Sequence, residues 1–170
     1  MKKIFSILFL VSVICISSIV KADYTTSFGA RVGKFASGAS LKHFFDANGS
    51  TGFEIWGTIT REANSGYMGK AFFVKQVTIF NSKLQIPVDM VFGVGGHFGL
   101  FKDNYYHIVK GEPEYYEHNA LNAGIDAQFG LEYNSRRVPI TVGIDVNPYY
   151  GLLNPGPEWL DVGLNVRFKF

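Results

Sequence analysis

The chain has 170 residues, of which 16% are aromatic, with 19 glycines and a single cysteine. Its 16 basic and 14 acidic residues nearly balance, so it lacks the excess of positive charge that is typical of nucleic-acid-binding proteins. One cysteine cannot form an intramolecular disulfide or a cysteine-rich metal site, and abundant aromatic residues and glycines favour strands and turns over helices.

The N-terminal residues have the pattern of a secretory signal peptide. Lys2 and Lys3 precede an apolar stretch over Ile4–Val20, which small or modest residues follow. We therefore expect a cleaved signal at 1–22 and a mature domain at 23–170. An uncleaved membrane anchor is the alternative, but the apolar stretch is at the short limit for a spanning helix. Cleavage would remove the only cysteine and three lysines, leaving 13 basic residues against 14 acidic ones.

Alternating polarity then predicts eight strands between turn signals. They are expected at Thr25–Lys34, Ser40–Asp46, Gly52–Arg61, Gly69–Phe80, Pro87–Phe101, Ala120–Tyr133, Pro139–Leu152 and Trp159–Phe170. Compact connections with Asn or Asp follow the second, fourth and sixth strands, and the other connections include the long segment 102–119. Because the number of strands is even, both ends of the mature chain lie on the side of the short turns.

The last predicted strand has the clearest alternation. Its even-numbered residues from Leu160 to Phe170 are all apolar, whereas its odd-numbered residues from Asp161 to Lys169 are polar or glycine. Successive side chains of a strand point to opposite faces, so one face is apolar and the other polar. In an exported chain this pattern is typical of a strand between lipid and a barrel interior. No later stretch is long enough for a transmembrane helix, and only closed barrels otherwise satisfy the backbone in lipid. The sequence therefore predicts an all-β fold, an eight-stranded antiparallel up-and-down transmembrane β-barrel.

Two segments resemble barrel proteins of this kind: GARVGKFASGASLKHFF at Gly29–Phe45 and GIDAQFGLEYNSRRVPITVGIDVNPYYG at Gly124–Gly151. Together with the signal and the aromatic C-terminus, they make the chain resemble the small eight-stranded outer-membrane β-barrel proteins of the OmpA/OmpX type. The resemblance implies a monomer in the outer membrane of a Gram-negative bacterium, in contact with outer-membrane lipid and lipopolysaccharide. It also implies that Phe168 and Phe170 are read by the barrel-assembly machinery during insertion. A simpler role for Phe170 is to anchor the strand at the membrane interface.

The polar faces of the predicted strands carry charges of both signs. The residues assigned to the interior are Arg31, Lys42, Glu54, Lys75, Asp89, Asp126, Glu132, Asp145, Asp161, Arg167 and Lys169. An eight-stranded barrel is only wide enough inside for side chains to fill it, and buried charges are retained when they are paired. We therefore expect a salt-bridged lumen with no open pore, in which inward glycines leave room for long basic side chains. We expect no metal and no other cofactor.

The segment 102–119 contains two tyrosine pairs with charged neighbours, which suit an exposed contact surface for an extracellular ligand or a host surface. The pairs are Tyr105 with Tyr106 and Tyr115 with Tyr116. Placement of these rings at the outer lipid interface is the alternative that we favour. These observations predict a structural or surface-interaction role.

Two other functions and one other fold are open at this point. Some barrels of this architecture modify lipid A by acyl transfer or deacylation, which needs a serine near a histidine base. No such arrangement occurs in the sequence, and His97, expected near Asp89 and Glu54, is interpreted as a satisfied interior group, so no catalytic residue is assigned. A narrow porin-like channel is the second alternative. A secreted lipocalin-like barrel is disfavoured because its apolar faces would point inward.

Overall fold

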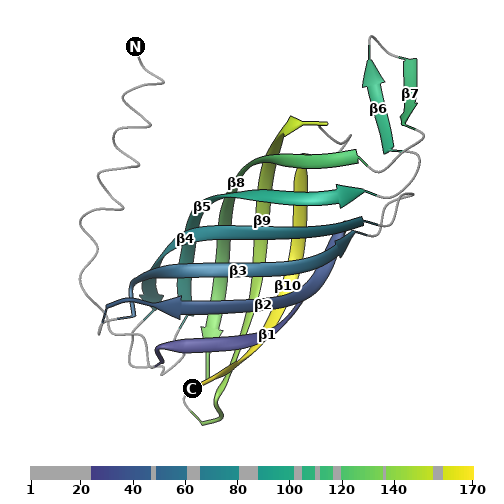
Figure 1. Cartoon of the computed structure of the whole chain (residues 1–170). Coiled ribbons are helices and arrows are strands. Elements are labelled where there is room, and N and C mark those ends of the chain that lie inside the picture. The colour runs from purple at the N-terminus through teal and green to yellow at the C-terminus, as the bar shows by residue number, and fades with distance from the viewer. Residues whose placement is uncertain are drawn as a thin grey trace, which may run out of the picture.

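A computed structural model describes residues 24–46, 49–60, 66–80, 88–101, 105–109, 112–116, 120–135, 137–154 and 159–170. Eight antiparallel strands form one closed barrel in the order β1-β10-β9-β8-β5-β4-β3-β2 (Figure 1). Their bounds are β1 (Thr26–Gly33), β2 (Ala36–Phe44), β3 (Thr51–Thr60), β4 (Gly66–Phe80), β5 (Val88–Phe101), β8 (Ala120–Asn134), β9 (Ile140–Leu153) and β10 (Leu160–Lys169). The predicted all-β, eight-stranded closed antiparallel barrel is confirmed.

The described residues form no helix that is long and apolar enough to cross a membrane. The signal peptide predicted at 1–22 and its boundary with the mature domain lie outside the described residues. Below, the end of the barrel where β1 begins and β10 ends is called the terminal end. The opposite end, where β5 ends and β8 begins, is called the loop end.

The first and last strands of the barrel close it. β1 and β10 pair from Ser27↔Lys169 to Gly33↔Gly163. Beyond this ladder, the Phe170 amide donates to the Thr26 carbonyl at 3.0 Å, and the Thr26 amide donates to the Phe170 carbonyl at 3.2 Å. Backbone pairing therefore continues to the last residue, and closure leaves the barrel without an open sheet edge.

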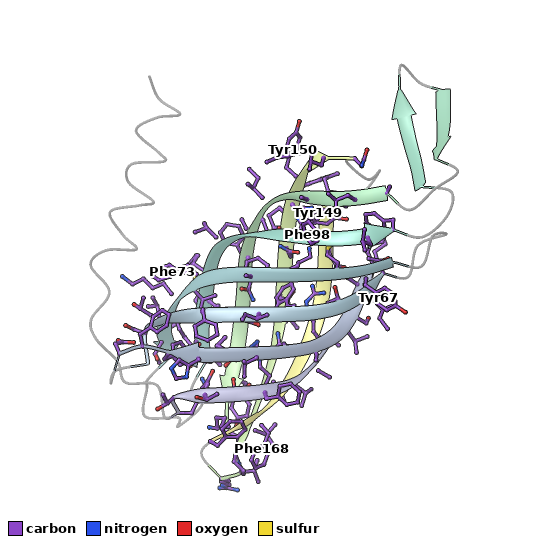
Figure 2. All side chains as sticks on the ribbon, in the orientation of Figure 1. Tyr67, Phe73, Phe98, Tyr149, Tyr150 and Phe168 are labelled. Carbon is purple, nitrogen blue, oxygen red and sulfur yellow. The ribbon has the colours of Figure 1, made fainter. Side chains whose placement is uncertain are left out.

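The two faces of the barrel wall differ in polarity. In β10, Phe168 is 53% exposed on the outer face while its neighbours Arg167 and Lys169 are buried. The other strands mostly repeat this arrangement, with large apolar side chains exposed outside and polar or charged side chains buried inside. A few apolar side chains of β3, β4 and β5 are also buried inside. The strand period of two is the reason, because it sends alternate residues to opposite faces. Figure 2 shows side chains on both sides of the wall, with Phe168 near the terminal end and Tyr150 near the loop end.

Two strands begin three or four residues earlier than the sequence predicts, and β3 begins one residue earlier. β2 begins at Ala36 instead of Ser40, and β4 begins at Gly66 instead of Gly69. The start of β2 is hard to recognise in the sequence because its first residues are small and show little alternation between polar and apolar side chains. Pairing with both neighbouring strands nevertheless extends β2. The Arg31 guanidinium also donates to the Ala36 carbonyl at 3.0 Å, which holds the short connection between β1 and β2.

The turn between β2 and β3 is built on Asp46. Its carboxylate accepts hydrogen bonds from the amides of Ser50 and Thr51, both at 2.9 Å, and from the Ser50 hydroxyl at 2.7 Å. Gly49 has a φ of 61°, a left-handed conformation that favours glycine. Partial desolvation raises the pKa of Asp46, but these hydrogen bonds outweigh it and hold the pKa below its usual value.

The segment 102–119, predicted as a loop, contains two strands that the sequence did not predict. β6 (Tyr105–Val109) and β7 (Glu112–Tyr116) form a separate two-stranded sheet. Figure 1 shows this hairpin beyond the loop end of the barrel. Its register places Tyr105 opposite Tyr116 and Tyr106 opposite Tyr115. Pro113 lies in a short polar run and disfavours a strand, because proline is confined to edge strands. β7 can contain it because both strands of a two-stranded sheet are edge strands.

Candidate functional site

The candidate site is the charged interior of the barrel. It contains three groups of ion pairs, and each group brings together side chains from strands that are far apart in the sequence. We describe them as the Glu132 cluster, the Arg31 cluster and the Lys70 cluster.

The Glu132 cluster consists of Lys42, Glu54, Glu132, Arg167 and Tyr24. The Lys42 ammonium lies 2.8 Å from Glu132 and 3.6 Å from Glu54. The Arg167 guanidinium lies 3.0 Å from Glu54 and 3.3 Å from Glu132. The Tyr24 hydroxyl donates to Glu132 at 2.5 Å. Two cations are thus shared between two carboxylates, and all four charged side chains are almost completely buried.

The Arg31 cluster lies around one guanidinium. Arg31 contacts Asp145 at 2.6 Å and Asp161 at 2.7 Å, so it bridges carboxylates on β9 and β10. Its Cζ lies 4.3 Å from the centroid of the Trp56 ring, which is a cation–π distance. The Trp56 indole in turn donates to Glu54 at 2.7 Å and thereby connects this cluster to the Glu132 cluster.

Gly163 makes room for the Arg31 guanidinium. A Cβ atom at this position would lie 2.7 Å from Arg31 Cζ, whereas a Cβ at Gly57 on the outer face would meet nothing within 4 Å. We expect Gly163→Ala to displace Arg31 from its carboxylates and to lower the free energy of unfolding by about 1–3 kcal/mol. Gly57→Ala is the matched control and is expected to leave stability nearly unchanged. Urea titration of both variants measures this, and equal stabilities would contradict the packing role of Gly163.

The Lys70 cluster lies nearer the loop end. Lys70 contacts Asp126 at 3.0 Å and donates to the Asn147 side chain at 2.5 Å. The other carboxylate oxygen of Asp126 lies 2.6 Å from His97 Nδ1. Tyr149 packs against this group, with its ring 4.3 Å from the Lys70 ammonium and edge-on to His97. The Asp126 carboxylate is therefore fully occupied by neighbouring donors.

Asp89 differs from the other interior acids. Its carboxylate accepts hydrogen bonds from Gln76 at 2.8 Å and from the side chains of Thr78 and Asn134. In the described part of the chain these partners are all neutral. Among the described residues, the Asp89 carboxylate is therefore stabilised by hydrogen bonds from neutral groups.

The structure places the predicted interior residues Arg31, Lys42, Glu54, Asp89, Asp126, Glu132, Asp145, Asp161, Arg167 and Lys169 inside the barrel. Lys75 is an exception, because it lies on the outer face beside Phe73 and opposite Phe92. It also pairs with Thr51, the first residue of β3, so it lies toward the terminal end. There the long apolar stem of a lysine can lie along the wall while its charged end reaches water.

Sequence reasoning missed Lys70, the lysine of β4 that does point inward. The inward face of β4 also carries Phe72 and Val74, which pack with Trp56 and Val91 in a small apolar cluster inside the barrel. Because both faces of β4 contain apolar residues, its alternation is weak. One signal was available: Lys70 and Gln76 are an even number of residues apart in β4, so their side chains point to the same face.

His97 also has a different partner from the expected one. It contacts Asp126, not Asp89 or Glu54. Among the described side chains, His43 bonds to the Thr26 hydroxyl and His97 to Asp126, so neither histidine is paired with a serine. The described residues also contain no group of three or more His, Cys, Asp or Glu side chains that could hold a metal ion.

The interior is closely packed around the Glu132 and Arg31 clusters. A cavity of about 10 Å³ lies between Gln128, Glu132, Asp145, Asn165 and Arg167. This volume is about that of one water molecule. The arrangement therefore fixes charged side chains in place at this level of the barrel.

The chain matches no protein-family model, and its sequence matches no curated protein.

Proposed function

We propose that this chain is an outer-membrane β-barrel of a Gram-negative bacterium with a structural or surface-interaction role. The observation that carries the proposal is the inverted polarity of the barrel. Apolar side chains such as Val94, Ile125 and Leu164 are more than half exposed, while Arg31, Lys42 and Arg167 are buried. Monomeric soluble proteins rarely expose contiguous apolar surface of this extent, whereas a membrane-spanning barrel needs it.

The distribution of aromatic residues supports a membrane orientation. Tyr67, Tyr150 and Trp159 are exposed near the loop end, and Tyr133 and Phe168 are exposed near the terminal end. Figure 2 shows Tyr67, Tyr150 and Phe168 at the periphery of the barrel. Tyrosine and tryptophan rings, which have an apolar body and a polar atom, favour the two membrane interfaces. In this proposal the loop end faces outward, the terminal end faces the periplasm, and 1–22 is the cleaved export signal.

The proposal gives the barrel interior a structural task. Ion pairs across the lumen fix the strands, and the packed Glu132 and Arg31 clusters obstruct the path from one end to the other. Contact with partners is then left to the outer wall and the loop end, including the β6–β7 hairpin and its tyrosine pairs. Lipopolysaccharide would contact the outer wall, and Phe168 and Phe170 would serve recognition by the assembly machinery.

Membrane location can be tested by expressing the full-length chain in a Gram-negative host. We expect unboiled protein to migrate differently from boiled protein on a gel, and to remain with the membrane fraction after carbonate extraction. Both results follow from a closed barrel whose outer face is apolar. Soluble behaviour together with a single gel mobility would overturn the membrane proposal.

The surface-interaction role needs a separate measurement. Deleting 105–116 removes the β6–β7 hairpin and leaves all eight strands of the barrel. We expect the variant to keep its heat-dependent gel shift and to lose binding to host cells or matrix. Unchanged binding would contradict a role for the hairpin. Mass spectrometry of lipid A from expressing cells would reveal an altered acyl pattern if the barrel were instead an enzyme.

The packed interior also predicts the behaviour of the protein in planar bilayers. We expect no stepwise conductance above that of the bare bilayer, because the Arg31 and Glu132 clusters obstruct the lumen. Defined open-channel steps from the heat-modifiable protein would show that the channel alternative is correct.

A further inference from the structure

The ladder between β8 and β9 is interrupted toward the loop end. The strands pair as far as Asp126↔Tyr149, and pairing resumes only at Phe129↔Val146. The residues between these two pairs are described but make no ladder contacts across this interface. Both pairs belong to the same register, so the strands stay aligned and only the ladder pairing of the residues between them is missing.

The interruption of the ladder has a covalent cause and a compensating contact. Pro148 lies in the unpaired stretch and has no N–H to donate to a ladder. The Ala127 carbonyl opposite it instead accepts a hydrogen bond from the Asn147 side chain at 2.7 Å. Because this carbonyl has a hydrogen-bond donor, the missing ladder pairing does not leave it unsatisfied.

A shallow surface groove of about 410 Å³ lies over this interruption of the ladder. Ala127, Pro148, Tyr150 and Trp159 line it from the outer face, and Asp126 and Tyr149 of the Lys70 cluster also line it. The volume is within the range of small-ligand sites. In Figure 2, Tyr150 and Tyr149 lie close to the loop end of the barrel.

The chemistry of the groove selects an uncharged, apolar occupant. Its only ionisable carboxylate, Asp126, is held by Lys70 at 3.0 Å and by His97 at 2.6 Å, so it offers no free charge to a ligand. The remaining surface is aliphatic, aromatic or proline. Trp159 and Tyr150 are rings with an apolar body and a polar atom, which suit the boundary between hydrocarbon and headgroups.

We propose that this groove binds one acyl chain of a membrane lipid. The inference rests on the proposed membrane location, because the groove opens on the wall that would face lipid. The chain would enter along the Pro148 interruption, with its headgroup end near Trp159. The groove thus provides a specific lipid site in addition to the general contact made by the outer wall.

The fluorescence of the two tryptophans can be used to measure lipid binding in the groove. Trp159 lines the groove and is 66% exposed, whereas Trp56 is 1% exposed inside the barrel. Fluorescence of the full-length protein is recorded in detergent micelles during titration with phosphatidylcholine that carries brominated acyl chains. We expect saturable quenching of Trp159 at one lipid per barrel. The variant Trp159→Phe reports Trp56 alone and is expected to show no quenching.

Filling the groove tests its specificity. Ala127→Phe places a ring in the groove and is expected to raise the lipid concentration for half-maximal quenching by about tenfold or more. Ala123→Phe, on the same face of the same strand, is the matched control and is expected to bind as the parent does. If Ala127→Phe lacks the folded gel mobility, the smaller change Ala127→Leu takes its place.

The outcomes separate this inference from the proposed function. In vesicles made wholly of brominated lipid, Trp159 is expected to be quenched in every variant that retains it, because its ring would face lipid. Quenching there without saturable binding in micelles, or without any effect of Ala127→Phe, would overturn the acyl-chain site alone. If Trp159 stays unquenched in the vesicles, both the membrane location and the groove proposal are wrong.

Discussion

Replacing Leu164 by arginine is expected to lower the free energy of unfolding by about 2–4 kcal/mol in a phospholipid bilayer. Leu164 lies in the middle of β10, is 58% exposed, and has Val162 and Val166 as its outer-face neighbours. A guanidinium at this position would lie in hydrocarbon, far from either interface. Urea-driven folding and unfolding in vesicles, followed by tryptophan fluorescence, measures the change.

The control for this experiment is Val138→Arg. Val138 has a similar exposure of 50% but lies in the turn before β9, at the terminal end. A charge near the interface costs only about 0–1 kcal/mol, so this variant should be nearly as stable as the parent. If Leu164→Arg is equally harmless, the outer face is not in contact with lipid and the membrane proposal fails.

Removing Arg167 is expected to cost about 3–5 kcal/mol, because it leaves two buried carboxylates with one remaining cation. Arg167 contacts both Glu54 and Glu132, and in Arg167→Met only Lys42 would be left to neutralise them. The same unfolding titration measures the loss.

Two further variants test the cause of this loss. Lys169→Met removes a lysine of the same strand that donates only to the Ser135 carbonyl among the described hydrogen bonds, so it should cost much less. Adding Glu132→Gln to Arg167→Met removes one of the uncompensated charges and should restore part of the stability. If the double variant is no more stable than Arg167→Met, uncompensated charge is not the reason for the loss.

The alternation of polar and apolar residues predicted which side chains point inward only in strands where one face is almost wholly polar. β10 and β8 have such faces, so their inward residues, including Asp126, Glu132 and Arg167, could be assigned from the sequence. β4 has apolar residues on both faces because Phe72 and Val74 pack against Trp56 inside the barrel. This is why Lys75 was assigned inward incorrectly and Lys70 was missed.

The partners of the interior charges could not be predicted in the same way. Arg167 on β10 reaches Glu54 on β3, and these two strands are separated by β1 and β2 in the barrel. His97 was expected near Asp89 and Glu54 but contacts Asp126 on the adjacent β8. Such contacts depend on barrel closure and register, which place residues at a common height across the lumen.

The sequence by itself determined that the chain forms strands with one apolar and one polar face, because side-chain direction in a strand has a period of two. It also indicated that the polar faces contain enough opposite charges to pair in a narrow interior. Only the tertiary structure decided which charges meet, that the ladder between β8 and β9 is interrupted at Pro148, and that the segment after β5 forms a hairpin. These features depend on register and closure between distant strands, which local alternation does not encode.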